Sequence, residues 1–162
     1  MTLEPPPEYP NARHLALRKA LGTFPSGVCV VTTEGEDGPV GITINSFTSV
    51  SLAPPLVLWC LDERSGRWPV FVAATHFRVH VLAAGEQALA HRYARGAARL
   101  VDGDQAFLAD RSLAVFECRV HQQVQTGDHM IIIGDVQSFQ DRPGSALTFH
   151  RGKYGSLEGG SE

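Results

Sequence analysis

Small polar side chains recur at alternate positions along residues 41–52. This period of two predicts a strand with one polar and one apolar face. A face of hydroxyls and an amide, without charge, is unusual toward solvent and suits hydrogen bonding to a flat uncharged molecule or to an anion. A Ser/Thr-rich barrel strand without a ligand explains the pattern equally well. The polar row contains Thr43, Asn45, Ser49 and Ser51, opposite Ile42, Ile44, Val50 and Leu52.

A continuous apolar run follows at residues 56–61. Its length and lack of alternation predict a strand that is buried on both faces. Residues 53–55, Ala-Pro-Pro, separate the two strands, because proline cannot sit inside a central ladder.

The run at residues 41–56 resembles the signature of the flavin reductase-like family, the small reductase subunits of two-component flavin monooxygenases. Segments 20–28, 127–129 and 147–154 resemble other family motifs in the same order, and the likeness extends over about residues 15–157. One such motif would be weak, but four in register are specific. The resemblance implies a mostly β fold, an FMN-binding split β-barrel, that pairs as a homodimer.

A flavin phosphate requires backbone N–H groups, hydroxyls and a cation. Ser65 and Arg67 lie in a polar loop that leads into an expected helix at Trp68, where a helix N-terminus favours anions. An ordinary solvated arginine is the alternative for Arg67, and Trp68 stands where the family often has threonine. The candidate cofactor-binding residues, most of them implied by the resemblance, are Ser26, Gly27, Val28, Thr43, Ile44, Asn45, Ser46, Ser49, Val50, Ser51, Ser65, Arg67, Trp68, Phe77 and Tyr154.

His129 is the candidate catalytic residue, since Gly127-Asp128-His129 resembles the family motif that contacts the nicotinamide end. An exposed turn histidine is the alternative. Tyr154 either closes over the site or packs the C-terminal region. The sequence has no Gly-x-Gly-x-x-Gly or Walker motif, so a dinucleotide would bind without a Rossmann fold. No metal site is expected, and His80 is expected in the core or at its rim.

These residues predict an NAD(P)H-dependent flavin oxidoreductase. It would reduce FMN, or FAD, with hydride from NADH or NADPH and supply reduced flavin to a partner monooxygenase. The alternatives are a split barrel that holds flavin for another redox step or for carriage, and a barrel without a ligand. Residues 96–111 form a shorter connection than the family usually has, which favours the alternative of a split barrel that holds flavin for another purpose.

The 162 residues predict one domain at 11–157, with a disordered arm at 1–10 and a flexible tail at 158–162. A net charge of −3 argues against nucleic-acid and anionic-membrane binding. Three irregularly spaced cysteines do not form a disulfide framework and favour a reducing compartment. Without a signal-peptide pattern, the expected location is the cytoplasm.

Hairpins of short strands must position the candidate residues. Helices are expected at residues 11–21, 68–74 and 85–95, and residues 96–111 have no regular pattern. Further strands are expected at 27–33, 39–44, 77–82, 112–124, 130–139 and 146–149, with 146–149 the last. This order is typical of a mostly β barrel.

Overall fold

The computed structural model describes residues 10–96 and 98–158. The expected terminal arm and tail therefore lie almost entirely outside the described residues. The helices are α1 (Ala12–Leu21), α2 (Trp68–Ala73), α3 (Gln87–Arg92) and α4 (Asp104–Arg111). The strands are β1 (Ser26–Gly27), β2 (Cys29–Gly35), β3 (Gly38–Ile44), β4 (Thr48–Leu52), β5 (Pro55–Asp62), β6 (His76–Val81), β7 (Ala114–Thr126), β8 (His129–Asp141), β9 (Ala146–His150) and β10 (Lys153–Leu157).

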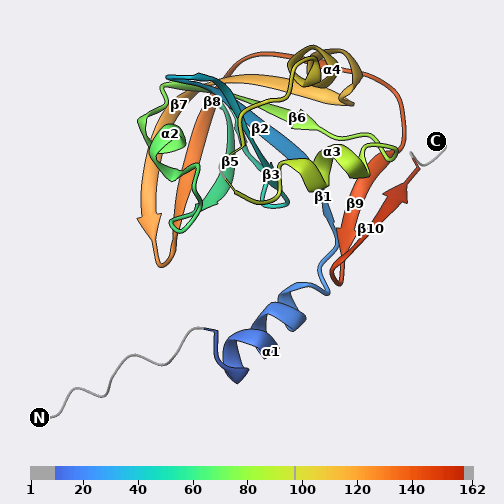
Figure 1. The fold of residues 1–162 in the computed structure, drawn as a ribbon. Coiled ribbons are helices and arrows are strands. Elements are labelled where there is room, and N and C mark those ends of the chain that lie inside the picture. The colour runs from blue at the N-terminus through green and yellow to red at the C-terminus, as the bar shows by residue number, and fades with distance from the viewer. Residues whose placement is uncertain (1–9, 97, 159–162) are drawn as a thin grey trace, which may run out of the picture.

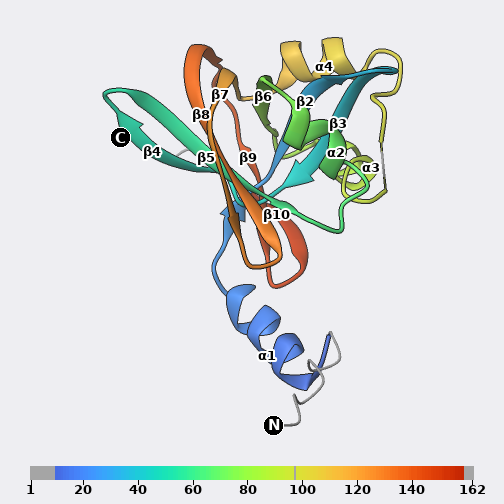
Figure 2. The ribbon, with the colours of Figure 1, turned by 90° about the vertical axis from the view of Figure 1, so that its left-hand side faces the viewer.

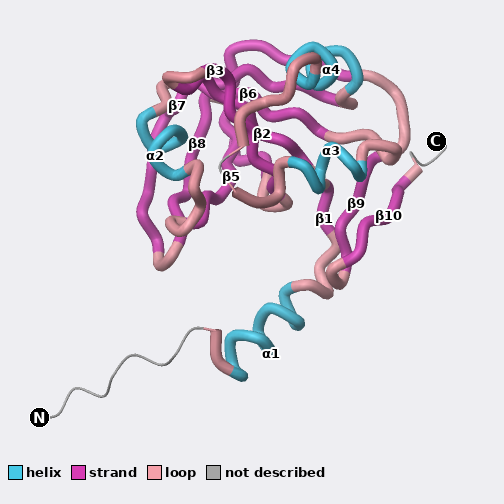
Figure 3. Tube along the Cα trace, viewed as in Figure 1, coloured by secondary structure: helices cyan, strands magenta, loops and turns pink. Residues whose placement is uncertain are grey.

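Strands are the predominant secondary structure of the described chain (Figure 3). Seven strands form an antiparallel sheet in the order β3-β2-β6-β7-β8-β5-β4, and a second sheet has the order β1-β9-β10. Strands β3 and β4 are the two edges of the large sheet, so its hydrogen-bonded ladder does not close. The predicted mostly β class is confirmed, and the open, curled sheet has the form of a split barrel (Figure 1).

The main core lies inside the curled sheet. Trp59 is fully buried and packs edge-to-face against Phe71 of α2 and Phe77 of β6. A Cβ at Gly134 of β8 would strike the ring of Phe77, so only glycine lets this ring lie on the sheet. A second cluster, which includes Leu82, Tyr93 and Leu108, joins the two sheets through α3 and α4.

Helix α1 stands away from the sheets (Figures 1 and 2). Asn11 caps it, because its side chain accepts a hydrogen bond from the His14 backbone N–H at 3.0 Å. None of its residues is buried. Local capping, rather than packing within this chain, therefore accounts for the predicted helix at 11–21.

Several sequence-based boundaries were wrong. The polar row does not lie on one strand, because β3 ends at Ile44 and β4 begins at Thr48. Strand β3 pairs with β2 and β4 pairs with β5, so the chain must cross between the two edges of the large sheet at residues 45–47.

Strand β5 alternates instead of being buried on both faces. Val57, Trp59 and Leu61 are buried, whereas the residues between them are half-buried, because the core covers one face of β5 only. Helix α4 and strand β10 were missed; α4 begins after Gly103, whose φ of 89° makes a sharp turn that periodicity does not reveal.

Candidate functional site

A groove of about 590 Å³ lies where the curled sheet brings the end of β3 beside β5. Here it is called the Arg67 groove. The loop after β5 and the loop after α3 complete its walls, and His129 stands at its edge. Seven of the residues predicted from the sequence line it: Thr43, Ile44, Asn45, Ser46, Ser65, Arg67 and His129.

Two of the hydroxyl groups tie the walls of the groove together. Thr43 donates from Oγ1 to the Ala90 carbonyl at 2.6 Å, which fixes β3 against α3. Ser46 Oγ accepts a hydrogen bond from the Cys60 N–H at 3.0 Å, which joins the end of β3 to β5. Asn45 is exposed, and its amide has no hydrogen bond to another described residue, so it is available to a ligand.

Arg67 is the most unusual residue of the groove, since it exposes only 2 % of its surface. Its Nε donates to the Gly41 carbonyl at 2.6 Å, and its Nη2 donates to the Arg95 carbonyl at 2.9 Å. Burial lowers the pKa of the guanidinium, which stays charged because its ordinary value is so high. Within the described residues, no carboxylate forms an ion pair with Arg67. The expected alternative, a solvated arginine, is therefore wrong.

Ser65 shapes the turn before α2. Its Oγ accepts a hydrogen bond from the Arg67 N–H at 3.2 Å, and its carbonyl accepts one from the Trp68 N–H at 2.9 Å. The turn thus holds a hydroxyl and a buried cation next to each other. Such a pair is typical of sites that bind a phosphate.

His129 is the first residue of β8, and its side chain is 41 % exposed. Its Nδ1 lies 2.7 Å from Asp128 Oδ1, and this hydrogen bond lowers the pKa of the Asp128 carboxyl. Opposite in the ladder, Asp62 pairs with Arg64, whose hydrogen bonds lower the pKa of Asp62 to about 2. The edge of the groove therefore combines two carboxylates, an arginine and an imidazole in contact with solvent.

The other predicted residues lie outside the Arg67 groove. Phe77 belongs to the main core and Trp68 packs against it, whereas Tyr154 of β10 packs against Phe149 and His91 on the second sheet. Strand β4 carries three of the predicted residues at the far edge of the large sheet, and β1 and the residue after it carry three more. These two sets are Ser49, Val50 and Ser51, and Ser26, Gly27 and Val28.

Sequence reasoning missed several residues that line the groove. Asp62 and Arg64 lie three residues and one residue before Ser65, so the polar run at 62–67 contained a signal for them. Cys60 lies in the apolar run at 56–61, which predicts a buried thiol in a strand and gives no signal for a groove residue. Residues 94–96 had no such signal, because only the tertiary packing of α3 against β3 brings them to the groove.

Comparison with known proteins places this geometry in a family. The model of the flavin reductase like domain matches residues 21–158. The chain is 43% identical over 146 residues to an FMN reductase (NADH), SmoA, of Agrobacterium fabrum, covering 86% of this chain and 84% of that protein. It is 39% identical over 146 residues to the reductase component of a flavin-dependent trigonelline monooxygenase of Acinetobacter baylyi, covering 85% of this chain but only 47% of that protein.

A solved structure also matches. The NADH:FAD oxidoreductase SgcE6 of Streptomyces globisporus, in complex with NAD and FAD fragments, superimposes with a TM-score of 0.75 at 34% identity, over 90% of this chain and 92% of that one. These relatives confirm, at the level of the family, the predictions of an oxidoreductase that works with flavin and a nicotinamide cofactor. The chain belongs to the flavin reductase like domain family.

Proposed function

We propose that this protein reduces flavin with a nicotinamide cofactor and supplies reduced flavin to a partner monooxygenase. FMN is the first expectation and FAD the second, with NADH or NADPH as the reductant. Relatives named for an NADH-dependent FMN reductase and for a monooxygenase reductase component support the proposal.

The observation that carries the proposal is the buried charge of Arg67. A buried cation is costly unless an anion neutralises it, and the described residues provide Arg67 only with carbonyl partners. A phosphate beside Ser65 would complete this environment. The available amide of Asn45 and the hydroxyl-lined end of β3 suit the edge of a flat ring with several hydrogen-bonding atoms.

Each residue then has a role of its own. Arg67 and Ser65 bind the phosphate, and Asn45 and Ser46 orient the ring. His129 orients the nicotinamide at the open edge of the groove, held by Asp128. A bound flavin supplies the redox chemistry by accepting hydride from the nicotinamide. The chain's own contribution is to bind and align two rings, which is why no acid–base pair is required.

Anaerobic mixing of the protein with NADH and excess FMN tests the function. We expect the flavin absorbance at about 450 nm to be lost over many turnovers. Tight binding of FMN without this loss would favour the alternative of a flavin-binding protein with another redox step or a carrier role. A protein that stays colourless and binds no flavin would overturn both.

We also propose a homodimer. Large apolar side chains are exposed on β4, on β8, and on and just after α1, and the outer face of β5 is only half-buried. These include Leu21, Phe24, Val50, Leu52 and Phe139. Light scattering coupled to size-exclusion chromatography should give twice the mass of the chain. Leu52→Glu, which puts a charge at a 94 % exposed position, should weaken the dimer.

A cytoplasmic location and a single domain over 11–157 remain part of the proposal. The location is supported by Cys29, Cys60 and Cys118, which are all free thiols, as expected in a reducing compartment. No helix in the described part of the chain is long and apolar enough to cross a membrane.

A further inference from the structure

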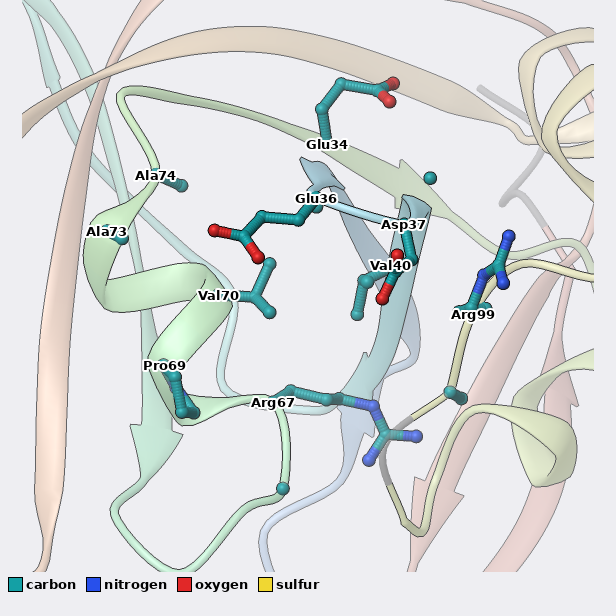
Figure 4. A pocket seen from close by; sticks show the side chains of 14 residues that line it. Glu34, Glu36, Asp37, Val40, Arg67, Pro69, Val70, Ala73, Ala74 and Arg99 are labelled. Carbon is teal, nitrogen blue, oxygen red and sulfur yellow. The ribbon is translucent and has the colours of Figure 1, made fainter.

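A second cavity, of about 490 Å³, lies between the β2–β3 turn and helix α2 (Figure 4). Here it is called the hairpin pocket. Its floor is apolar, with Val40 of β3 and Val70 of α2, and the carboxylates of Glu36 and Asp37 lie above this floor (Figure 4). Arg99 stands at the side of the pocket opposite α2 (Figure 4). Glu34 also lines the pocket, with its carboxylate pointing away from this floor (Figure 4).

The hairpin pocket adjoins the Arg67 groove. Gly66 and Arg67 line both cavities, so the buried guanidinium stands at their common wall. Each cavity falls within the range of about 300–1,000 Å³ that is typical of small-molecule sites. FAD with its phosphates at Arg67 can therefore extend one end into each cavity. A nicotinamide cofactor that binds together with FMN, whose phosphate occupies Arg67, can do so with its own phosphates at Arg99.

The charges of the hairpin pocket point to the chemistry of that second end. Its three carboxylates and Arg99 are exposed and form no ion pair with a described residue. Carboxylates accept hydrogen bonds from an exocyclic amine and from ribose hydroxyls, and the apolar floor suits the face of a base. Arg99 and Arg67 suit a phosphate.

We propose that the hairpin pocket binds the adenosine monophosphate end of a dinucleotide. This inference rests on the proposed function and extends it. The dinucleotide is either the flavin (FAD) or the nicotinamide cofactor, since both carry the same adenosine end. Carboxylates that accept from the ribose hydroxyls repel an additional phosphate on that ribose. With the nicotinamide cofactor in the pocket, the site therefore selects NADH over NADPH.

Ala73→Trp fills the hairpin pocket with little risk to the fold, since Ala73 is an exposed residue at the end of α2 that lines the pocket. Thr75→Trp is the matched control, because Thr75 is also exposed, follows the same helix and does not line the pocket. For both variants, fluorescence quenching gives the Kd for FAD and for FMN. Steady-state kinetics give KM for NADH and for reduced nicotinamide mononucleotide, which lacks the adenosine end.

Two results support the proposal and identify the source of the adenosine end. If FAD uses the pocket, Ala73→Trp raises the ratio of the FAD Kd to the FMN Kd by about 10-fold. If NADH uses it, the ratio of the NADH KM to the mononucleotide KM rises by about the same factor. Thr75→Trp should change neither ratio. Unchanged ratios in Ala73→Trp would overturn the proposal.

Failure of the proposed function would look different. Flavin binding is measured without turnover, so the FAD to FMN ratio can change even in a protein that does not oxidise NADH. Conversely, if the wild-type protein oxidises NADH and Ala73→Trp changes neither ratio, the proposed function stands and the proposed role of the hairpin pocket is wrong.

A double variant tests the selection of NADH over NADPH by the carboxylates of the hairpin pocket. In the NADH case, Glu36→Gln with Asp37→Asn should raise kcat/KM for NADPH relative to NADH by about 10-fold at low ionic strength, and less in high salt. Glu117→Gln is the control, since Glu117 is an exposed carboxylate outside both cavities that pairs with Arg78. An unchanged preference in the double variant would contradict the selection.

Discussion

Arg67 and His80 expose 2 % and 3 % of their surfaces, but the molecule accommodates these two buried ionisable groups in opposite ways. Arg67 keeps its charge, and its described partners are two carbonyls at the wall of the groove. His80 meets the hydroxyl of Thr32 at 3.0 Å inside the sheet, and burial lowers its pKa to about 4, so it is neutral at pH 7.

The contrast separates a structural role from a binding role. His80 is neutral and is held by one hydrogen bond with Thr32, so it carries no charge that an outside ion would have to neutralise. A buried guanidinium that has only neutral partners is stabilised further when an anion arrives. The following experiments test this difference.

Removal of the Arg67 charge should have the largest effect. Arg67→Met keeps much of the side-chain volume, and we expect the FMN Kd to rise about 1,000-fold, or ~4 kcal/mol, because a buried cation–phosphate contact is lost. Quenching of flavin fluorescence on binding measures this Kd. The carbonyls of Gly41 and Arg95 also lose their donor, which should lower the free energy of unfolding by about 2 kcal/mol.

Two further variants control this experiment. Arg78→Met removes an exposed arginine of a surface ion pair and should leave FMN affinity unchanged. Arg67→Lys retains a charge and should recover part of the affinity. A folded Arg67→Met protein with wild-type FMN affinity would place the phosphate elsewhere.

His80 should make stability depend on pH. Its folded pKa is about 4 and its ordinary value is 6.5, so the unfolded chain takes up a proton first as the pH falls. Its contribution to stability is complete above pH 6.5 and is lost toward pH 4, by about 3 kcal/mol in total. Urea unfolding at a series of pH values measures this slope.

His80→Gln should flatten that slope, since glutamine does not titrate and can still meet Thr32. His76→Gln, on the same strand but exposed, should leave the slope as in the wild type. An equal slope in the wild type and His80→Gln would assign the acid sensitivity to other groups.

His129 is less buried than Arg67 and His80, so removal of its side chain should have a smaller effect than removal of either of theirs. We expect His129→Ala to lower kcat/KM for NADH by about 10-fold, with the FMN Kd nearly unchanged. His121→Ala, an exposed histidine on β7, is the control. Equal losses of flavin affinity and NADH turnover would argue against a role on the nicotinamide side.

The sequence predicts the parts of the site that are close together along the chain. Thr43 and Asn45 were found because the polar row is a local pattern, Ser46 through the family resemblance, and Ser65 and Arg67 because they precede a helix. Ser49 and Ser51 share that pattern but lie at the other edge of the sheet, since periodicity does not show where a strand breaks.

Burial of Arg67 could not be predicted in this way. Its two acceptors, Gly41 and Arg95, lie 26 and 28 residues away, and only the packing of α3 against β3 brings them together. Helix α4 was missed for a related reason. Arg92 and the hydroxyl of Tyr93 both donate to Asp104 at 2.5 Å, so α4 is held by tertiary contacts that no short window contains.

Exposed ion pairs complete the comparison, because they should matter least. Glu117→Gln breaks the pair with Arg78, whose side chains are 51% and 46% exposed. Water solvates both groups before and after the change, so the free energy of unfolding should fall by less than about 1 kcal/mol. Urea unfolding at pH 7 in low and high salt measures this. The distinction between Arg67 and the surface arginines depends on burial. If Glu117→Gln lowers the free energy of unfolding as much as Arg67→Met does, burial does not determine how much a charge contributes to stability in this protein.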